Sequence, residues 1–208
     1  MKSMYILIAI VSLLLITSIG YGLWFEALRV NVYVETGSSD PQIGSYKAFI
    51  CCEHYSHCSP DSCDCKGVED YQVVLSSDNK TLTIYDIECG ECCNCCNTSS
   101  TYNVTLWIGL VVVNEGNLPA KIENATIEVT GNYSYFIVTP YVYGPYETGI
   151  GYNEWGNVDP CELPYPDYKE YVVLDPGVKA IMWLNVTVYN VSGTIALDVQ
   201  LTNGLWNQ

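Results

Sequence analysis

The most regular pattern in the chain lies near its start, where apolar and polar residues alternate strictly from Leu28 to Glu35. A period of two with branched residues on one face is typical of a half-buried β-strand. A Gly-Ser-Ser-Asp-Pro run follows and predicts a flexible hinge over residues 38–44. We therefore expect residues 23–37 to form an N-terminal strand, although periodicity alone favours an ordinary first strand of the domain's own sheet. Its apolar face consists of Leu28, Val30, Val32 and Val34.

The rest of the sequence predicts short strands, and no 3.6-residue periodicity is sustained over three turns. The second half of segment 102–114 is apolar at every position, which predicts a central strand buried on both faces. Together the patterns predict an all-β sandwich over residues 45–208, with a long Tyr- and Pro-rich loop at residues 140–167. The expected strands are 45–50, 71–75, 81–87, 102–114, 120–131, 133–139, 171–174, 179–189 and 194–202.

The first residues have the features of an export signal. Lys2 supplies a positive charge, residues 4–16 are almost entirely apolar, and Gly20 and Gly22 place small residues where a signal peptidase cleaves. We expect residues 1–22 to be a signal peptide that is removed, which predicts an extracellular protein at the cell surface. The alternative is a retained anchor, because residues 4–25 are long enough to span a bilayer.

The chain is strongly acidic, with 8 Lys and Arg against 23 Asp and Glu and a formal net charge of −15. This charge argues against a nucleic-acid partner and against an anionic membrane surface, so we expect membrane contact only through the signal segment during export. Seven Asn-X-Ser/Thr sequons predict a glycoprotein. The candidate asparagines are Asn79, Asn97, Asn103, Asn124, Asn132, Asn185 and Asn190.

Eleven cysteines in an exported chain predict disulfide bonds. Two polar loops, residues 51–66 and 89–96, hold five cysteines each, and one further cysteine lies in the long loop. We expect bridges within or between the two loops, with the pairing open and one thiol left over. The cysteines are Cys51, Cys52, Cys58, Cys63, Cys65, Cys89, Cys92, Cys93, Cys95, Cys96 and Cys161.

Other site chemistry has weaker support in the sequence. His54 and His57 lie among the first group of cysteines, so a zinc site is an alternative to disulfides there. Asp159, Glu162 and Asp167 of the long loop are candidate calcium ligands, although their spacing matches no known calcium loop. The chain has no G-x-S-x-G and no H-E-x-x-H motif. We therefore expect no enzymatic activity, no cofactor and no resident metal.

Three segments carry a resemblance to a known family. They are Trp24–Gly37 directly after the signal segment, the strand–N-x-G-x-x-P–strand pattern at Val111–Ile122, and the L-x-P-G turn before a closing strand at Val173–Leu184. In this order they resemble the TasA/camelysin superfamily, and most closely its archaeal members that build bundling pili. The resemblance implies a jelly-roll-like subunit that polymerises by donor-strand complementation. The implied polymerisation residues are Trp24, Leu28, Val30, Val32 and Val34.

The expected function is therefore that of a structural subunit of an extracellular, pilus-like filament. Identical subunits would associate head to tail, and the filament would serve adhesion, cell–cell contact or a biofilm matrix. One alternative is a membrane-anchored, monomeric cell-surface glycoprotein or binding domain. The other is a Cys/His metal-binding or redox protein.

Overall fold

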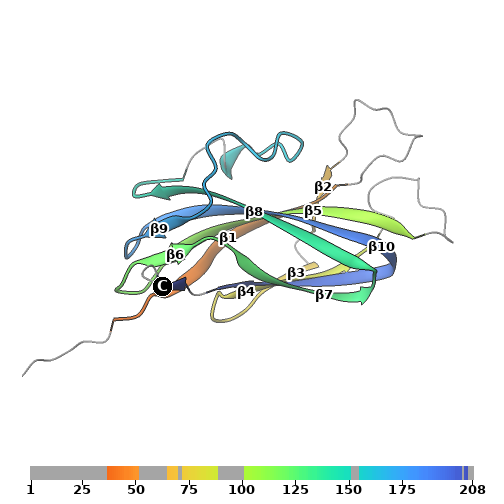
Figure 1. Cartoon of the computed structure of the whole chain (residues 1–208), viewed down its shortest axis with the longest axis horizontal. Helices are drawn as coiled ribbons and strands as arrows, with labels where there is room; N and C mark the ends of the chain where they lie inside the picture. The colour runs from red at the N-terminus through yellow and green to blue at the C-terminus, as the bar shows by residue number, and fades with distance from the viewer. Residues whose placement is uncertain are drawn as a thin grey trace, which may run out of the picture. The chain divides into compact units, whose positions relative to one another are not determined.

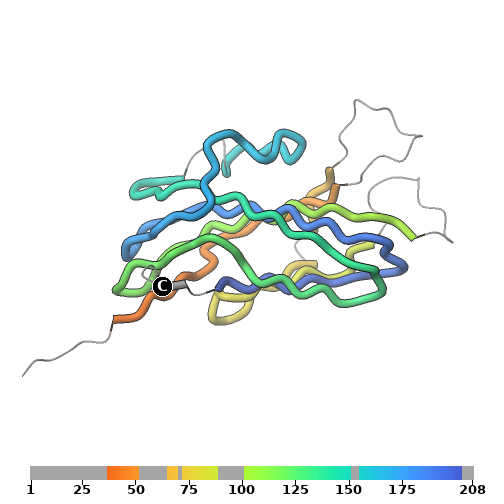
Figure 2. The backbone as a smooth tube through the Cα atoms, viewed as in Figure 1, coloured from red at the N-terminus to blue at the C-terminus, as the bar shows by residue number. Residues whose placement is uncertain are grey.

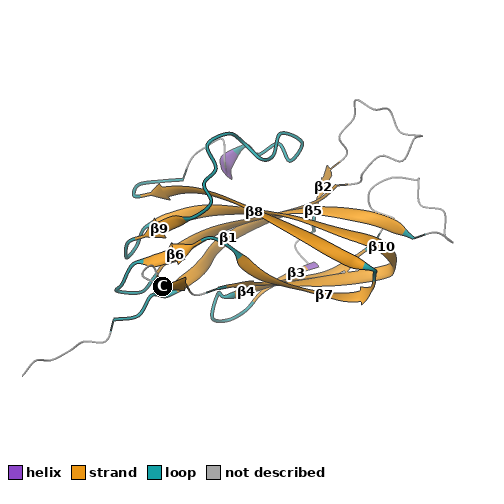
Figure 3. Cartoon of the chain, in the orientation of Figure 1, coloured by secondary structure: helices purple, strands orange, loops and turns teal. Residues whose placement is uncertain are grey.

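The computed structural model describes residues 37–51, 65–69, 72–88, 101–150 and 155–202, and the backbone of residues 204–205. Apart from short helical turns at residues 72 and 155–156, its regular structure is entirely β (Figure 3), which confirms the predicted all-β class. The strands are β1 (Pro41–Cys51), β2 (Cys65–Gly67), β3 (Val73–Leu75), β4 (Thr81–Ile87), β5 (Tyr102–Asn114), β6 (Ala120–Ile122), β7 (Ala125–Asn132), β8 (Tyr135–Tyr146), β9 (Val172–Leu174), β10 (Lys179–Leu201) and β11 (Gly204–Leu205).

Two curled antiparallel sheets form the layers of a sandwich (Figure 1). The first sheet has the strand order β2-β1-β5-β10-β8. The second has the order β7-β10-β4-β3. A third, small sheet joins β11, β6 and β9. The jelly-roll wiring implied by the resemblance stays a prediction.

Strand β10 belongs to both large sheets. Its first half, Lys179 to Val188, pairs with β5 and β8, and its second half, Ile195 to Leu201, pairs with β4 and β7. Between the halves the register shifts and Asn190 has a φ of 56°, so the strand passes from one layer to the other (Figure 2). The sequence predicted a turn between two strands at residues 190–193, whereas the structure has a corner within one long strand.

The main core fills the space between the two layers. Leu106, Ile108 and Leu110 of β5 are fully buried, as are Leu82 and Ile84 of β4 in the facing sheet. All five lie at alternate positions of their strands, so a period of two places them on the inward face. Burying such side chains is the dominant favourable term in folding.

A second apolar cluster covers the outer face of the first sheet. Trp107 and Trp183 are buried there beneath Trp155, Leu163 and other residues of the long loop. Strand β5 is therefore buried on both faces in its second half, as its apolar run predicted. The described part of the long loop contributes packing to the domain.

Several boundaries differ from the expected ones. Residues 41–44, expected in a hinge, begin β1, because their backbone pairs with β5 and the side chain of Ile43 is buried. The expected strand 120–131 is broken at residues 123–124 into β6 and β7. The expected loop 140–167 begins later, since β8 continues to Tyr146 alongside β10.

Candidate functional site

The edge strand β7 is the clearest candidate for a functional surface. Its residues alternate between the core and the solvent, with Ile127 and Val129 inward and Thr126 and Glu128 outward. Strand β7 pairs with β10 on one side, and no described strand pairs with its other side. Such an edge presents N–H and C=O groups to which a further strand can bind.

The core is incompletely covered along this edge. Ten partly buried apolar residues pack against the main core in the described part of the chain, and half of them belong to β7, β8 and the turn between these strands. An added strand would remove this area from water, which stabilises by about 25 cal/mol per Å². The residues are Ile127, Val129, Tyr133, Phe136 and Val138.

Two carboxylates oppose each other on the outer surface of the same edge. Glu128 of β7 is the direct cross-strand partner of Asp198 of β10. Like charges in this position destabilise a strand pair. Thr83 donates a hydrogen bond to Asp198 Oδ1 at 2.5 Å, but neither carboxylate has an ion pair among the described residues. A cation placed beside β7 would relieve this repulsion.

The other sheet edges are shorter or partly occupied. Strand β3 has three residues. Strand β1 pairs with β2 at its C-terminal end, and near its start the N–H of Ile43 donates to the carbonyl of Asn79 at 2.7 Å. Strand β8 accepts a hydrogen bond from the Lys169 N–H at the Val142 carbonyl, 2.7 Å away. Strand β7 therefore offers a longer continuous edge than β3, without the partial cover of β1 and β8.

The turn after β5 anchors the residues that lead into β1. Asn114 is fully buried, and its Oδ1 accepts hydrogen bonds from the N–H groups of Asp40 at 3.2 Å and Gly116 at 3.1 Å. Its Nδ2 donates to the carbonyls of Leu118 at 2.8 Å and Leu174 at 2.9 Å. These four bonds use both donors and both lone pairs of the amide, so one side chain joins β5, β9 and the start of the domain.

Gly116 lets the leading segment approach this turn closely. A Cβ at residue 116 would lie 2.3 Å from the Ser38 carbonyl oxygen, closer than any side chain permits. The Ser38 N–H donates to Asn117 Oδ1 at 2.8 Å, and the Ser38 carbonyl accepts from the Asn117 N–H at 3.0 Å. Residues 38–40 of the predicted hinge are therefore held against the domain.

An ion pair stabilises the same region. Lys80 Nζ lies 2.7 Å from Asp40 Oδ1, and Gln42 donates to Asp40 Oδ2 at 2.9 Å. The hydrogen bond from Lys80, followed by that from Gln42, lowers the pKa of Asp40 below its ordinary value. The same contact raises the pKa of Lys80. Both side chains are about a third exposed, so solvent screens this pair and its contribution is modest.

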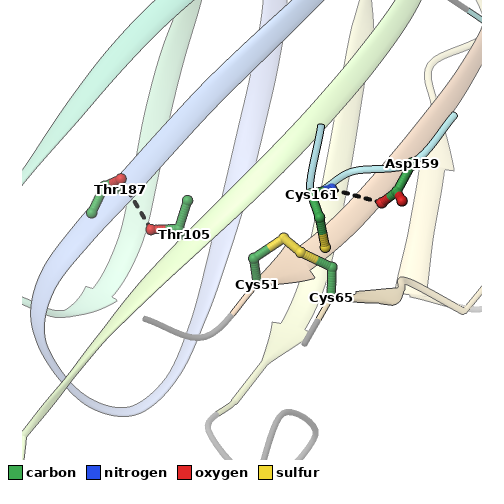
Figure 4. The surroundings of a disulfide bond; sticks show 6 residues. All are labelled: Cys51, Cys65, Thr105, Asp159, Cys161 and Thr187. Atoms are coloured by element: carbon green, nitrogen blue, oxygen red, sulfur yellow. Dashed lines mark hydrogen bonds between the residues drawn. A yellow bond between two sulfur atoms is a disulfide. The ribbon is translucent and has the colours of Figure 1, made fainter. Parts of the chain in front are cut away.

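One predicted disulfide is present among the described cysteines. Cys51 at the end of β1 is bonded to its cross-strand partner Cys65 in β2, which closes a loop within the first cysteine group. Figure 4 shows the Cys161 sulfur beside this bridge, and Cys161 is itself disulfide-bonded. The long loop thus reaches the first cysteine group, a proximity that sequence spacing did not indicate.

Many of the predicted site residues lie outside the described residues. These include the strand residues Trp24, Leu28, Val30, Val32 and Val34, both histidines, and Asn97. The same holds for eight cysteines, Cys52, Cys58, Cys63, Cys89, Cys92, Cys93, Cys95 and Cys96. Of the described sequon asparagines, Asn124, Asn132 and Asn190 are exposed, while Asn79, Asn103 and Asn185 are half-buried.

The candidate calcium ligands are not assembled into a site. No group of three His, Cys, Asp or Glu side chains among the described residues could hold a metal ion, so Asp159, Glu162 and Asp167 do not form one. Asp159 instead accepts a hydrogen bond from the Cys161 N–H at 2.9 Å. In the part of the chain that the structure describes, no helix has the length and apolar character needed to cross a membrane.

Comparisons with known proteins do not assign the chain to a family. No family model, no curated protein and no solved structure matches it.

Sequence reasoning missed two features of this region. Asn114 belongs to the N-x-G-x-x-P pattern, but its role as an anchor depends on contacts with residues 40 and 174 that are far away in sequence. The opposition of Glu128 and Asp198 depends on the register between β7 and β10. The acidic residue within an otherwise uncharged alternating strand was the available signal for Glu128.

Proposed function

We propose that this protein is an exported, non-enzymatic structural subunit that assembles head to tail into an extracellular filament. Residues 23–35 of one subunit form a strand that adds to the β7 edge of the next subunit. The observation that carries this proposal is the β7 edge, which no strand in the described part of the chain covers, with its half-buried Ile127 and Val129. Added strands bind such edges through main-chain hydrogen bonds, and alternate side chains provide specificity.

The pattern of the N-terminal segment matches the pattern of β7. Each has eight residues, Leu28–Glu35 and Ala125–Asn132, in which apolar and polar positions mostly alternate. Side chains that are directly opposite in neighbouring strands share a face of the sheet. The apolar face of the added strand would therefore extend the core, and its polar face would remain in solvent.

Charge complementarity indicates which residues of the two strands lie opposite each other in the proposed pairing. Arg29 is the only arginine of the chain, and the alternation predicts that it lies on the polar face of the N-terminal strand. Placed opposite Glu128, it would neutralise the repulsion between Glu128 and Asp198. In either strand direction, this register sets Leu28 and Val30 opposite Ile127 and Val129. The apolar and the ionic matches thus support the same alignment.

The anchored segment 38–40 supports the proposal in a second way. The bonds from Asn114 and Asn117 fix the point at which the chain leaves the domain. Fixing this attachment point limits the positions open to the preceding segment, which lowers the entropy cost of binding a neighbour. A contact of this head-to-tail kind does not close on itself and so produces a filament.

Deletion of residues 23–35 tests the proposal. We expect the truncated chain to be exported, to keep its fold by circular dichroism, and to form no filaments in electron micrographs. A synthetic peptide of residues 23–37 should then bind the truncated protein and raise its melting temperature, while the same peptide with Val32→Asp should not. Filaments of unchanged appearance after the deletion would contradict the proposal.

A further inference from the structure

Three sequons converge on the corner where β10 passes between the sheets. The Asn190 N–H donates to Asn103 Oδ1 at 3.1 Å, and Asn190 Nδ2 donates to Ser134 Oγ at 3.2 Å. Ser192 is the cross-strand partner of Asn132. The start of β5, the turn between β7 and β8, and the corner of β10 therefore bring acceptor asparagines and sequon hydroxyls together.

Exposure divides the sequons of this region into two classes. The transferase that glycosylates an Asn-X-Ser/Thr sequence must contact both the asparagine amide and the Ser/Thr hydroxyl. Acceptor sequons therefore lie on accessible surface. At the corner, Asn132 and its hydroxyl partner Ser134 are both exposed, as are Asn190 and Ser192. Asn190 has a φ of 56°, outside the extended conformation of a strand. The corner thus presents two complete acceptor sequences.

In the sequons of Asn103 and Asn185, the hydroxyl group that a transferase must contact is buried. Their third residues, Thr105 and Thr187, are cross-strand partners in β5 and β10, and each is only 8% exposed. The two hydroxyls hydrogen-bond each other at 3.1 Å (Figure 4). Residues 185–187 are paired on both sides, with β5 and with β8, and Thr105 of the other sequon is paired with both Thr187 and Cys51. A transferase cannot contact either hydroxyl unless β5 and β10 separate.

We infer that Asn132 and Asn190 form a paired N-glycosylation site and that Asn103 and Asn185 are not modified in the folded domain. In the reaction, Nδ2 of the asparagine forms a C–N bond to the anomeric carbon of an oligosaccharide carried by a lipid phosphate. The bond between that carbon and the phosphate oxygen breaks, the lipid phosphate leaves, and the amide gives up one proton. The two glycans then project from one corner of the sandwich.

The glycans have a protective role at this corner. Tyr135 and Ile137 of β8 are 52% and 50% exposed beside the site, and the Tyr135 ring stacks on Tyr189 with 4.5 Å between centroids. Exposed apolar residues next to a sheet edge promote unwanted strand pairing. Hydrated sugar chains at residues 132 and 190 would cover this part of β8. The site does not depend on the proposed filament and would be used by a monomeric surface protein as well.

Glycopeptide mass spectrometry of the full chain, secreted by a host that N-glycosylates exported proteins, tests this inference. We expect high occupancy at Asn132 and Asn190 and none above background at Asn103 and Asn185. Occupied Asn185 on folded, secreted protein would overturn the inference, as would unoccupied Asn132 and Asn190 on protein that carries glycans elsewhere. Protein without any glycan, from a host that modifies a control sequon protein, would overturn it too.

Hydroxyl variants separate glycosylation from folding. Ser134→Ala and Ser192→Ala remove the acceptor sequences while keeping both asparagines, and each should lose the glycan of its own sequon only. Ser134→Thr and Ser192→Thr keep the hydroxyl and should restore the modification. Loss of both glycans in either Ala variant, with circular dichroism unchanged, would show that the two sites are not independent acceptors and would overturn the assignment of two complete sequons.

Discussion

Glu128 of the edge strand β7 lies directly opposite Asp198 of β10, and the two carboxylates repel each other on the surface of the second sheet. A cross-strand pair of like charges lies here beside an edge that no described strand covers. A strand that added to this edge with a positive charge on its outer face would relieve the repulsion. Its apolar side chains would cover the inward face, where Ile127 and Val129 are half-buried.

The face assignment of the N-terminal strand leads to a first prediction. Val32→Asp should abolish assembly, because it places a carboxylate on the buried face and forfeits about 1.5–3 kcal/mol of apolar burial per interface. Asn31→Asp is the matched control, since the alternation predicts that residue 31 lies on the polar face. Sedimentation of secreted protein measures the filament fraction, and equal losses in the two variants would show that the faces are assigned wrongly.

The buried Asn114 leads to a prediction about stability. Asn114→Ala leaves four backbone groups without their partner, so we expect the free energy of unfolding to fall by at least about 2 kcal/mol. Asn117→Ala, at an exposed residue that accepts one bond from Ser38, should cost no more than about 1 kcal/mol. Urea denaturation compares the two, and similar losses would contradict the anchoring role of Asn114.

The contact between Gly109 and Trp183 gives a prediction about the second core. A Cβ at residue 109 would lie 2.5 Å from Cη2 of the Trp183 ring, so Gly109→Ala should overpack the cluster and cost about 1–3 kcal/mol. Gly67→Ala is the control, because a Cβ there meets no atom within 4 Å. A melting temperature unchanged by Gly109→Ala would mean that the Trp183 ring is not packed tightly against residue 109 of β5.

The ion pair of Asp40 and Lys80 predicts a small pH dependence. The pKa of Asp40 is lowered, so its contribution is present above the ordinary carboxyl pKa of 3.8 and is lost as pH falls through the lowered value. The pKa of Lys80 is raised, so its contribution is lost only when pH rises through that raised value. Asp40→Asn should thus destabilise at about pH 6 and should destabilise less at about pH 2, below the ordinary carboxyl pKa. Thermal melts measure the decrease in melting temperature caused by Asp40→Asn at each pH. Equal decreases at the two pH values would contradict this account.

The strands were predictable from sequence because their signal is local. The buried segment Tyr102–Asn114 was predicted with the bounds that the structure gives it, since its side chains alone encode burial on both faces. The corner at Asn190 was not, because a turn between two strands and a corner within one strand use the same residues, Asn and Gly. Only the pairing of β10 with β4 and β7 distinguishes them.

The candidate site was less predictable because it depends on topology. The N-terminal strand could be proposed from its alternation, but the edge that would receive it could not. Identifying β7 required knowledge of which strands lack a second neighbour. The hinge over residues 38–44 was misplaced for a similar reason: Pro41 and Gly44 resemble a breaker, yet Pro is tolerated as the first residue of a strand.

The most direct measurement is electron microscopy of a charge exchange between Arg29 and Glu128. Arg29→Glu and Glu128→Arg should each prevent filament formation, because each sets like charges opposite one another in the proposed register. The double variant, with both substitutions, should form filaments again. If each single variant assembled like the original protein, or if the double variant failed to recover while remaining folded and secreted, the pairing of the N-terminal strand with β7 would be contradicted.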